Sequence, residues 1–410
     1  MMKPSAIYIL MFLMMPFQPL SALLTAGTGI DDPAYEQTRT LNIVYTGSIN
    51  GELEPCGCSP KTDFGGVARR GGYLRGHRKT LFPYILIDSG NFLSKDTPQG
   101  RLKAEAMIKS MSIMKYDVVA FLRNEKGFSY DFLSPLLRKF KIPAISDAPP
   151  YRQSTTIRCG GMIINVSAEP KDYKNGKLNI LLTDRTITEA SSLKGWDVII
   201  LSQAKEGPSE LENPIRVNET VIVRGYPKGQ KLGILSLKVD RKGKVIDFRH
   251  RWQPLGRDVR EDPALRRVLK EYDNKVARLL RNHYTPPEKT VYLGVSKCIE
   301  CHQPFVEGWK KTKHASAFAT LQRVGKSNDP ECIKCHTVGS GEEGGFHRIE
   351  TTPHLSNVQC EACHGPGRDH LLDFSKPMQP VVEYVCLKCH TKSTSPDFNY
   401  PVYLEKVKHK

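Results

Sequence analysis

Cys298-Ile-Glu-Cys-His302 is the first of four copies of the pattern Cys-x-x-Cys-His that lie between residues 298 and 390. Two cysteines one helical turn apart can both bond to the vinyl groups of a haem, and the histidine that follows can coordinate its iron. A zinc ribbon requires no histidine after each cysteine pair, and scattered disulfides would not produce this repeat. The pattern therefore predicts four covalently bound haem c groups. The predicted attachment residues are Cys298, Cys301, Cys332, Cys335, Cys360, Cys363, Cys386 and Cys389, and the predicted proximal iron ligands are His302, His336, His364 and His390.

The N-terminus has the pattern of a secretory signal. Lys3 supplies a basic start and residues 6–24 an apolar run. We predict a signal peptide over residues 1–26, with an uncleaved membrane anchor as the alternative, and a polar leader over 27–40. Because covalent haem attachment takes place on the exported side of the bacterial inner membrane, the two signals agree. We expect a periplasmic or otherwise exported bacterial protein. Membrane association through the N-terminus and an extracellular location stay open.

The charge of the chain bears on its partners. The 410 residues carry a formal net charge of +17, which taken alone suggests nucleic acid or an anionic surface. Haem propionates offset part of this charge, the basic residues are dispersed through both halves, and an exported protein seldom meets nucleic acid. We therefore predict redox partner proteins and no nucleic acid. A basic face that steers an acidic partner and an ordinary solvated surface both remain open.

Short β-rich runs alternate with helical patterns in the first half of the chain. The spacing of Met107, Met111 and Met114 predicts a helix over 102–114 in which the methionines pack in the core rather than bind a ligand. This order predicts an α/β sandwich domain over residues 41–257. The predicted strands are 41–46, 84–88, 117–121, 178–183, 196–202, 220–224, 232–240 and 244–251.

Several segments of this domain, taken in order, resemble the metallophosphoesterase domain of the 5′-nucleotidase family. They include Leu41-Asn-Ile-Val44, Gly51-Glu-Leu-Glu-Pro55, Gly65-Gly-Val-Ala-Arg-Arg70, Leu86-Ile-Asp-Ser-Gly-Asn-Phe92 and Lys231-Leu-Gly233. The resemblance implies a metallophosphoesterase-like fold, whose family members hold two metal ions for hydrolysis of phosphate esters.

Most positions that carry metal ligands in that family hold other residues here. Asp88 is kept, but the expected histidines and the second carboxylate are absent. The substituted positions are Ser48 and Asn50 after the first strand, Asn91 after the second, Asn124-Glu125, and Ser202-Gln-Ala-Lys205. The sequence therefore predicts a phosphoesterase-like domain without its metal centre.

Three cysteines lie outside the haem motifs. In an oxidising compartment Cys56, Cys58 and Cys159 are expected to form one disulfide and leave one thiol. A redox-active pair at Cys56 and Cys58, or a soft-metal site that includes Cys159, is the alternative.

The domain boundary follows from a helix signal. Asp262 as N-cap and Pro263 at the first helical position predict an amphipathic helix. We assign residues 258–290 to a linker helix, 291–400 to a mainly helical and loop tetrahaem cytochrome c domain, and 401–410 to a basic tail.

A c-type haem that only transfers electrons commonly has a second axial histidine. The candidates for this sixth ligand are His314, His347, His354 and His370, with His283 and His409 at the edges of the region.

The residues around these histidines narrow the choice of distal ligand. Trp309-Lys-Lys-Thr-Lys-His314 and Cys363-His-Gly-Pro-Gly367, in this order, resemble the tetrahaem cytochrome c-554 family. The resemblance implies that His370 is the distal ligand of the first haem and His314 that of the third. It also implies that the second haem, on His336, lacks a strong sixth ligand.

The sequence departs from that family in two places. His347 and His354 lie just before the third motif, and the chain ends soon after the fourth. The fourth haem must therefore find its partner elsewhere than in the family's C-terminal extension. His354 is the first candidate for an additional ligand, to the second or fourth haem, and His347 is the second candidate.

These features predict an exported multihaem cytochrome that transfers electrons, a carrier rather than a catalyst. One alternative is a haem enzyme that reduces a small nitrogen or oxygen compound at an open haem. The other is an active phosphoesterase fused to a cytochrome.

Overall fold

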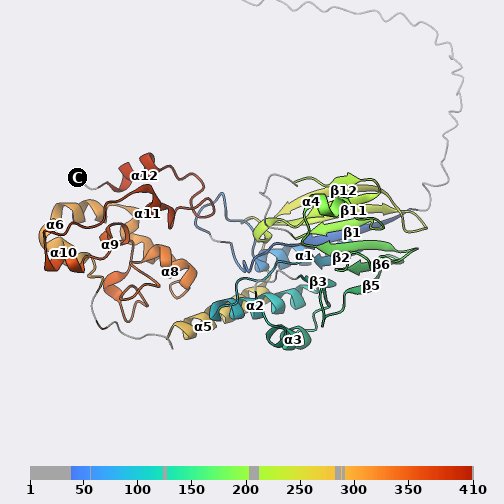
Figure 1. The fold of residues 1–410 in the computed structure, drawn as a ribbon, viewed down its shortest axis with the longest axis horizontal. Coiled ribbons are helices and arrows are strands. Elements are labelled where there is room, and N and C mark those ends of the chain that lie inside the picture. The colour runs from blue at the N-terminus through green and yellow to red at the C-terminus, as the bar shows by residue number, and fades with distance from the viewer. Residues whose placement is uncertain are drawn as a thin grey trace, which may run out of the picture. The chain divides into compact units, whose positions relative to one another are not determined.

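The structure is a computed structural model that describes residues 38–55, 57–122, 127–202, 212–281, 288 and 291–408 (Figure 1). The predicted signal peptide, most of the leader, Cys56, Asn124-Glu125, His283 and His409 lie outside the described residues. No helix among the described residues is long and apolar enough to cross a membrane.

The first region contains two six-stranded sheets. Sheet A has the strand order β12-β11-β1-β2-β3-β4, and sheet B has the order β5-β6-β7-β8-β10-β9. The strands of sheet A are β1 (Arg39–Thr46), β2 (Tyr84–Asp88), β3 (Val118–Phe121), β4 (Ala144–Ser146), β11 (Lys231–Val239) and β12 (Val245–Pro254). Those of sheet B are β5 (Ser154–Cys159), β6 (Met162–Ser167), β7 (Leu178–Thr183), β8 (Val198–Leu201), β9 (Ile215–Val217) and β10 (Thr220–Arg224).

The two sheets pack face to face, and helices cover the outer faces. One apolar cluster joins side chains of both sheets, including Ile43 of β1 and Ile180 of β7. A second cluster lies between sheet A and its helices, and a third beside sheet B. The helices are α1 (Val67–Leu81), α2 (Pro98–Met114), α3 (Tyr130–Lys139), α4 (Ile187–Ser191) and α5 (Pro263–Arg281). The α/β sandwich predicted from the sequence is therefore the observed fold.

Parallel strands bring one set of loops together at each edge of a sheet. β1, β2, β3 and β4 run parallel, so the loops after them meet at the carboxyl edge of sheet A. The strands predicted at 84–88, 178–183 and 220–224 have the predicted bounds. The sequence analysis did not include β4, β5, β6 and β9 or helices α1 and α3, because short or half-exposed elements give weak apolar patterns.

Helix α5 begins as predicted, with the Asp262 side chain accepting the Ala264 amide at 2.7 Å. It is not a free spacer. Leu265, Leu269 and Val276 are buried in the core between sheet A and its helices, while Leu280 packs against the core of the haem-motif region. The helix therefore belongs to both regions.

The haem-motif region consists of short helices and turns (Figure 1). Its helices are α6 (Val295–Lys310), α7 (Ala317–Arg323), α8 (Pro330–His336), α9 (Cys360–His364), α10 (Arg368–Leu372), α11 (Glu383–Leu387) and α12 (Tyr400–Val407), with the 3-10 turns η3 (Lys313–Ser316) and η4 (Pro353–Leu355). The segment 401–410, assigned to a basic tail, contains most of α12, which starts on an Asn399 cap and whose Tyr403 ring lies 5.5 Å from that of His390.

Candidate haem-binding centres

Each Cys-x-x-Cys-His motif begins on a helix. The first, second and third lie within α6, α8 and α9, and the fourth starts in α11. Residues three apart on a helix share one face, so each cysteine pair presents both thiols to the same side. Asp329 and Pro330 start α8 as N-cap and first residue, and His302 leaves helical geometry within α6 (φ −119°, ψ 37°).

His302, the first proximal ligand, faces His370. The two imidazole centroids are 6.3 Å apart and the rings are 28° from parallel. A metal–imidazole bond is about 2 Å, so two imidazoles on opposite sides of one iron place their centroids on the order of 6 Å apart. The His370 Nδ1 lies 2.8 Å from the Lys376 carbonyl, which orients the ring and leaves Nε2 to bind metal. This pair fits a six-coordinate haem and agrees with the resemblance.

His390, the fourth proximal ligand, faces His314. Their centroids are 6.2 Å apart with 46° between the rings. Burial lowers the pKa of His314, as do the neighbouring His390 and His336, which favours the neutral ring that a metal ligand requires. The resemblance implied that His314 serves the third haem. The structure instead brings it to the fourth, because the turn η3 holds it beside the C-terminal motif.

His336, the second proximal ligand, has an oriented ring. Its Nδ1 lies 2.7 Å from the Ala317 carbonyl and 3.3 Å from the Thr320 hydroxyl, which leaves Nε2 for iron. Within the part of the chain that the structure describes, no imidazole ring is stacked opposite it.

His364 and the two remaining candidates are placed differently. His364 Nδ1 lies 3.2 Å from the Gln379 carbonyl. His354 is exposed on η4, and His347 lies 3.3 Å from the Thr351 hydroxyl. His347 and His354 remain candidate distal ligands from the sequence.

The cysteines show which motifs are neighbours. A hydrogen bond with Cys360 raises the pKa of Cys298, and the pKa of Cys360 falls to about 7. Cys389 and Cys335 form the same kind of pair, in which the pKa of Cys335 falls to about 7. A thioether does not titrate, so the property that persists after haem attachment is the proximity of the sulfurs.

A further contact joins these two pairs. Burial, and after it the nearby Cys386 and Cys360 thiols, raise the pKa of Cys363 to about 11. The motifs therefore follow one another in space in the order first, third, fourth, second.

Aromatic side chains line the facing histidines. Phe305 lies 5.9 Å from the His302 ring and Phe374 lies 5.9 Å from the His370 ring. Phe398 stacks on His390 at 4.9 Å. Flat apolar side chains beside two axial ligands suit the faces of a porphyrin. The sequence analysis missed these residues, since an isolated aromatic carries no local signal.

A buried ion-pair group joins the second motif to α5. Lys326, which precedes α8, binds Asp273 of α5 at 2.7 Å and also contacts Glu54 of the first region. Burial lowers the pKa of Lys326, but the two carboxylates outweigh it and hold the pKa above its usual range. The second motif is thus anchored to the phosphoesterase-like region.

The carboxyl edge of sheet A holds hydrogen-bonded polar groups where the related family holds metal. Ser48 Oγ and Asn91 Nδ2 each donate to the Ser202 carbonyl at 2.6 Å. Asp88 accepts from Thr46 at 2.6 Å, and burial raises its pKa to about 6. Among the described residues no group of three His, Cys, Asp or Glu could hold a metal ion.

One buried cation near this edge was not singled out from the sequence. Arg70 is fully buried, its three guanidinium nitrogens have no hydrogen-bond partner among the described residues, and its charge lowers the pKa of Asp88 against the larger effect of burial. The motif that contains it offered no signal for burial.

The remaining cysteines agree with the expected disulfide. Cys58 is disulfide-bonded and Cys159 is a free thiol. Burial raises the pKa of Cys159, and its Sγ lies 3.5 Å from the Tyr84 carbonyl. Cys159 is therefore a partly buried thiol whose raised pKa disfavours the reactive thiolate.

Comparisons with known proteins separate the two regions. Residues 297–365 match the family model described as cytochrome c554 and c-prime. Cytochrome c-554 of Nitrosomonas europaea is 35% identical over 101 residues, which cover 21% of this chain and 43% of that protein. The snake venom 5′-nucleotidase of Naja atra is 23% identical over 292 residues, which cover 55% of each chain. This chain therefore spans about half the length of these curated relatives.

The fold comparison agrees. The 5′-nucleotidase precursor from Thermus thermophilus superimposes with a TM-score of 0.51 at 15% identity, covering 77% of this chain and 73% of that one. The C-terminal region thus resembles the cytochrome c-554 family, which implies haem c. It follows a domain with a metallophosphoesterase-like fold.

Proposed function

We propose that this protein is an exported electron carrier whose C-terminal region transfers electrons through four covalently attached haems. The observation that carries the proposal is the pair of facing imidazoles, His302 with His370 and His314 with His390, at 6.3 and 6.2 Å. Haem c supplies one-electron chemistry between ferrous and ferric iron.

The protein's own residues set the conditions for that chemistry. Two axial histidines close both faces of an iron, which favours electron transfer over substrate binding. The carbonyls that accept from Nδ1 of His370 and His336 fix the ring orientations. Phe398 stacks on the His390 ring and covers one of its faces.

The order of the motifs supports a linear path. The Cys298–Cys360, Cys363–Cys386 and Cys335–Cys389 contacts connect the first, third, fourth and second motifs in turn. Electrons would therefore enter or leave at the His302 and His336 ends. The His336 end is the one anchored to the first region through Lys326 and Asp273.

The first region is proposed to position this module and not to hydrolyse phosphate esters. Ser48 and Asn91 are engaged with a main-chain carbonyl, and amide and hydroxyl donors are poor substitutes for bridging carboxylates and imidazoles. Export is proposed from the sequence pattern at residues 1–26 together with the haem motifs.

The test is a census of the haems in the purified protein. Mass spectrometry of the intact chain should show four attached haems. Ferric electron paramagnetic resonance should show low-spin iron for the haems on His302 and His390. A high-spin signal from either, or fewer than four haems, would contradict the proposal.

A second candidate function rests on His336. Because no described imidazole is stacked opposite it, that haem is the place where a small nitrogen or oxygen compound would bind. In the same spectra one high-spin ferric signal that cyanide converts to a low-spin signal, or that nitric oxide abolishes, would favour this candidate. Four low-spin haems would exclude it.

A further inference from the structure

The amino edge of sheet A, opposite the carboxyl-edge loops, is formed by chain segments that precede the parallel strands. β1 begins at Arg39, and the segments before β2, β3 and β4 contain Phe82, Lys115 and Lys141. The β5–β6 turn reaches the same place, since Arg39 Nη1 donates to the Gly161 carbonyl at 2.5 Å. These segments form one continuous surface, which we call the basic edge.

The charge of the basic edge is one-sided. The segments 39–42, 78–84, 112–118, 138–144 and 157–162 contain eight Lys and Arg and a single acid, Asp117. Asp117 is partly buried and accepts the Leu86 amide at 2.7 Å, so it faces inward. The exposed cations include Arg39, Lys79, Lys115, Lys141 and Arg158.

Helix ends do not account for this charge. α1, α2 and α3 all end at the basic edge, and each helix C-terminus carries about half a negative charge that basic residues offset. Three such ends balance fewer than two of the eight cations. Lys139 also pairs with Glu105, with 3.7 Å between Nζ and Oε1. The remaining surplus of exposed cations is available to an external anion.

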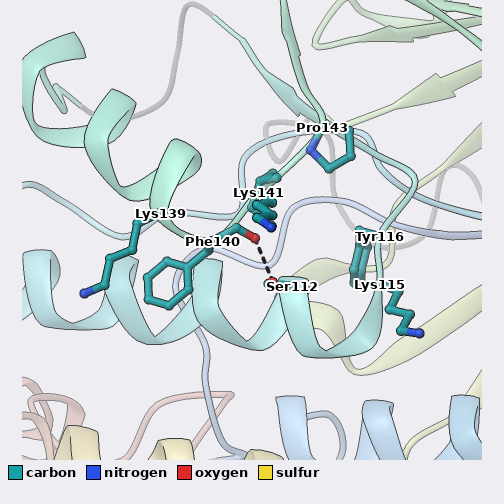
Figure 2. Close-up of a pocket in the computed structure, with 8 residues that line it drawn as sticks. Ser112, Lys115, Tyr116, Lys139, Phe140, Lys141 and Pro143 are labelled. Carbon is teal, nitrogen blue, oxygen red and sulfur yellow. Dashed lines mark hydrogen bonds between the residues drawn. The ribbon is translucent and has the colours of Figure 1, made fainter.

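The basic edge also has an apolar element and a cavity. Phe82 is 73% exposed, although aromatic side chains of this size are usually buried. A cavity of about 380 Å³ on this edge is lined by Tyr116 and by three lysines, Lys115, Lys139 and Lys141. Figure 2 shows Lys139 on one side, Lys115 on the other and Lys141 between them.

The distribution of charged residues along the chain also favours the region that contains the basic edge. Residues 38–281 contain 43 Lys and Arg against 26 Asp and Glu, whereas residues 291–410 contain 15 against 13. The net positive charge therefore belongs to the phosphoesterase-like region and not to the haem-motif region.

We propose that the basic edge lies on a membrane surface and binds the headgroups of anionic phospholipids. Lysines and arginines around an exposed aromatic are the combination that binds such an interface. Charge complementarity favours this occupant, because the exposed cations of the basic edge match the anionic headgroups. In the sequence, the apolar run of residues 6–24 also precedes β1 by about a dozen residues. The proposal does not depend on the electron-transfer function.

The experiment measures protection of lysines in the full-length, haem-loaded protein. Acetylation with a water-soluble reagent is followed by mass spectrometry, with vesicles of phosphatidylcholine alone or with one third phosphatidylglycerol. Lys115 and Lys141 should react about tenfold more slowly with the anionic vesicles, and Lys270 on the outer face of α5 should be unchanged. Equal reactivity of Lys115 and Lys141 in both vesicle types would overturn the proposal.

Charge-reversed variants provide a second readout. Lys115→Glu with Lys141→Glu should lower the salt-sensitive part of vesicle binding about tenfold. Arg267→Glu with Lys270→Glu, which makes the same charge change on α5, should leave it within twofold. Equal loss in both variants would mean that only net charge matters and would overturn the proposal. Protection by an acidic protein or an oligonucleotide, but not by anionic vesicles, would assign the edge to that partner instead and overturn the lipid proposal.

Discussion

The two regions of this protein obtain their cores in different ways. The phosphoesterase-like region buries three apolar clusters between and beside its sheets. The haem-motif region has a described core of seven buried side chains, and it exposes Leu372, Phe374 and Tyr384 by 70%, 70% and 71%. So small a core cannot stabilise a region of about a hundred residues. The first region is complete by itself, whereas the second is built around a cofactor.

Loss of one haem should test this difference with the largest effect. We expect Cys360→Ser with Cys363→Ser to lower the mass by one haem and to make the whole haem-motif region sensitive to protease, because the third motif contacts both the first and the fourth. Limited proteolysis with peptide mapping checks this. The first region is the internal control, and its fragments should persist. A protease-resistant haem region in the variant would show that its protein core suffices.

Removal of a distal ligand should have a smaller effect confined to one haem. His314→Ala should convert the haem on His390 from low to high spin while the other three keep their spectra. Ferric electron paramagnetic resonance measures the change. The exposed His354 provides the matched variant, and His354→Ala should leave the haem on His390 low-spin. If His354→Ala also makes the haem on His390 high-spin, the pairing of His314 with His390 is wrong.

A cavity created in the core of the first region should lower the unfolding free energy of that region and leave the haem absorbance unchanged. Leu269→Ala, at a fully buried position of α5, should cost about 3 kcal/mol of unfolding free energy. Urea titration followed by far-ultraviolet circular dichroism measures the cost, and the haem absorbance reports the other region. Coincident loss of both signals would show that the two regions unfold as one unit.

The smallest effect expected is a pH dependence of the first region. Burial raises the pKa of Asp197 to about 6, and its carboxylate accepts the Asn179 amide at 2.7 Å. Because the folded pKa lies above the unfolded value, the stabilising contribution is complete below about pH 4 and is lost as pH rises through 6. The loss should be about 1–2 kcal/mol after allowance for partial exposure.

The variant Asp197→Asn isolates this contribution. It keeps an acceptor for the Asn179 amide but cannot ionise, so the stability of the first region should change less between pH 4 and 7 than in the wild type. Thermal unfolding at several pH values is the measurement. An unchanged pH profile would assign the dependence to other groups.

Much of the fold followed from local patterns. Strand β7 is a continuous apolar run and α5 starts with Asp262-Pro263, so the residues themselves determine both elements. The strands β5 and β6 flank the Gly160-Gly161 turn, and neither was recognised, because β5 is half-exposed and β6 is a run of only six residues. The end of the chain was read as a tail, because nothing local shows that Tyr403 packs against His390.

By itself, the sequence determined the haem attachment sites. In Cys-x-x-Cys-His, one helical turn brings both thiols to the same side, and the next residue is the histidine that coordinates iron, so no distant residue is required. Tertiary structure decided which distal histidine meets which motif. His314 precedes His390 by 76 positions, and only the packing of η3 beside the fourth motif places their rings 6.2 Å apart. It also gathered the basic edge, since its five segments share no sequence signal and become one surface only when parallel strands begin side by side.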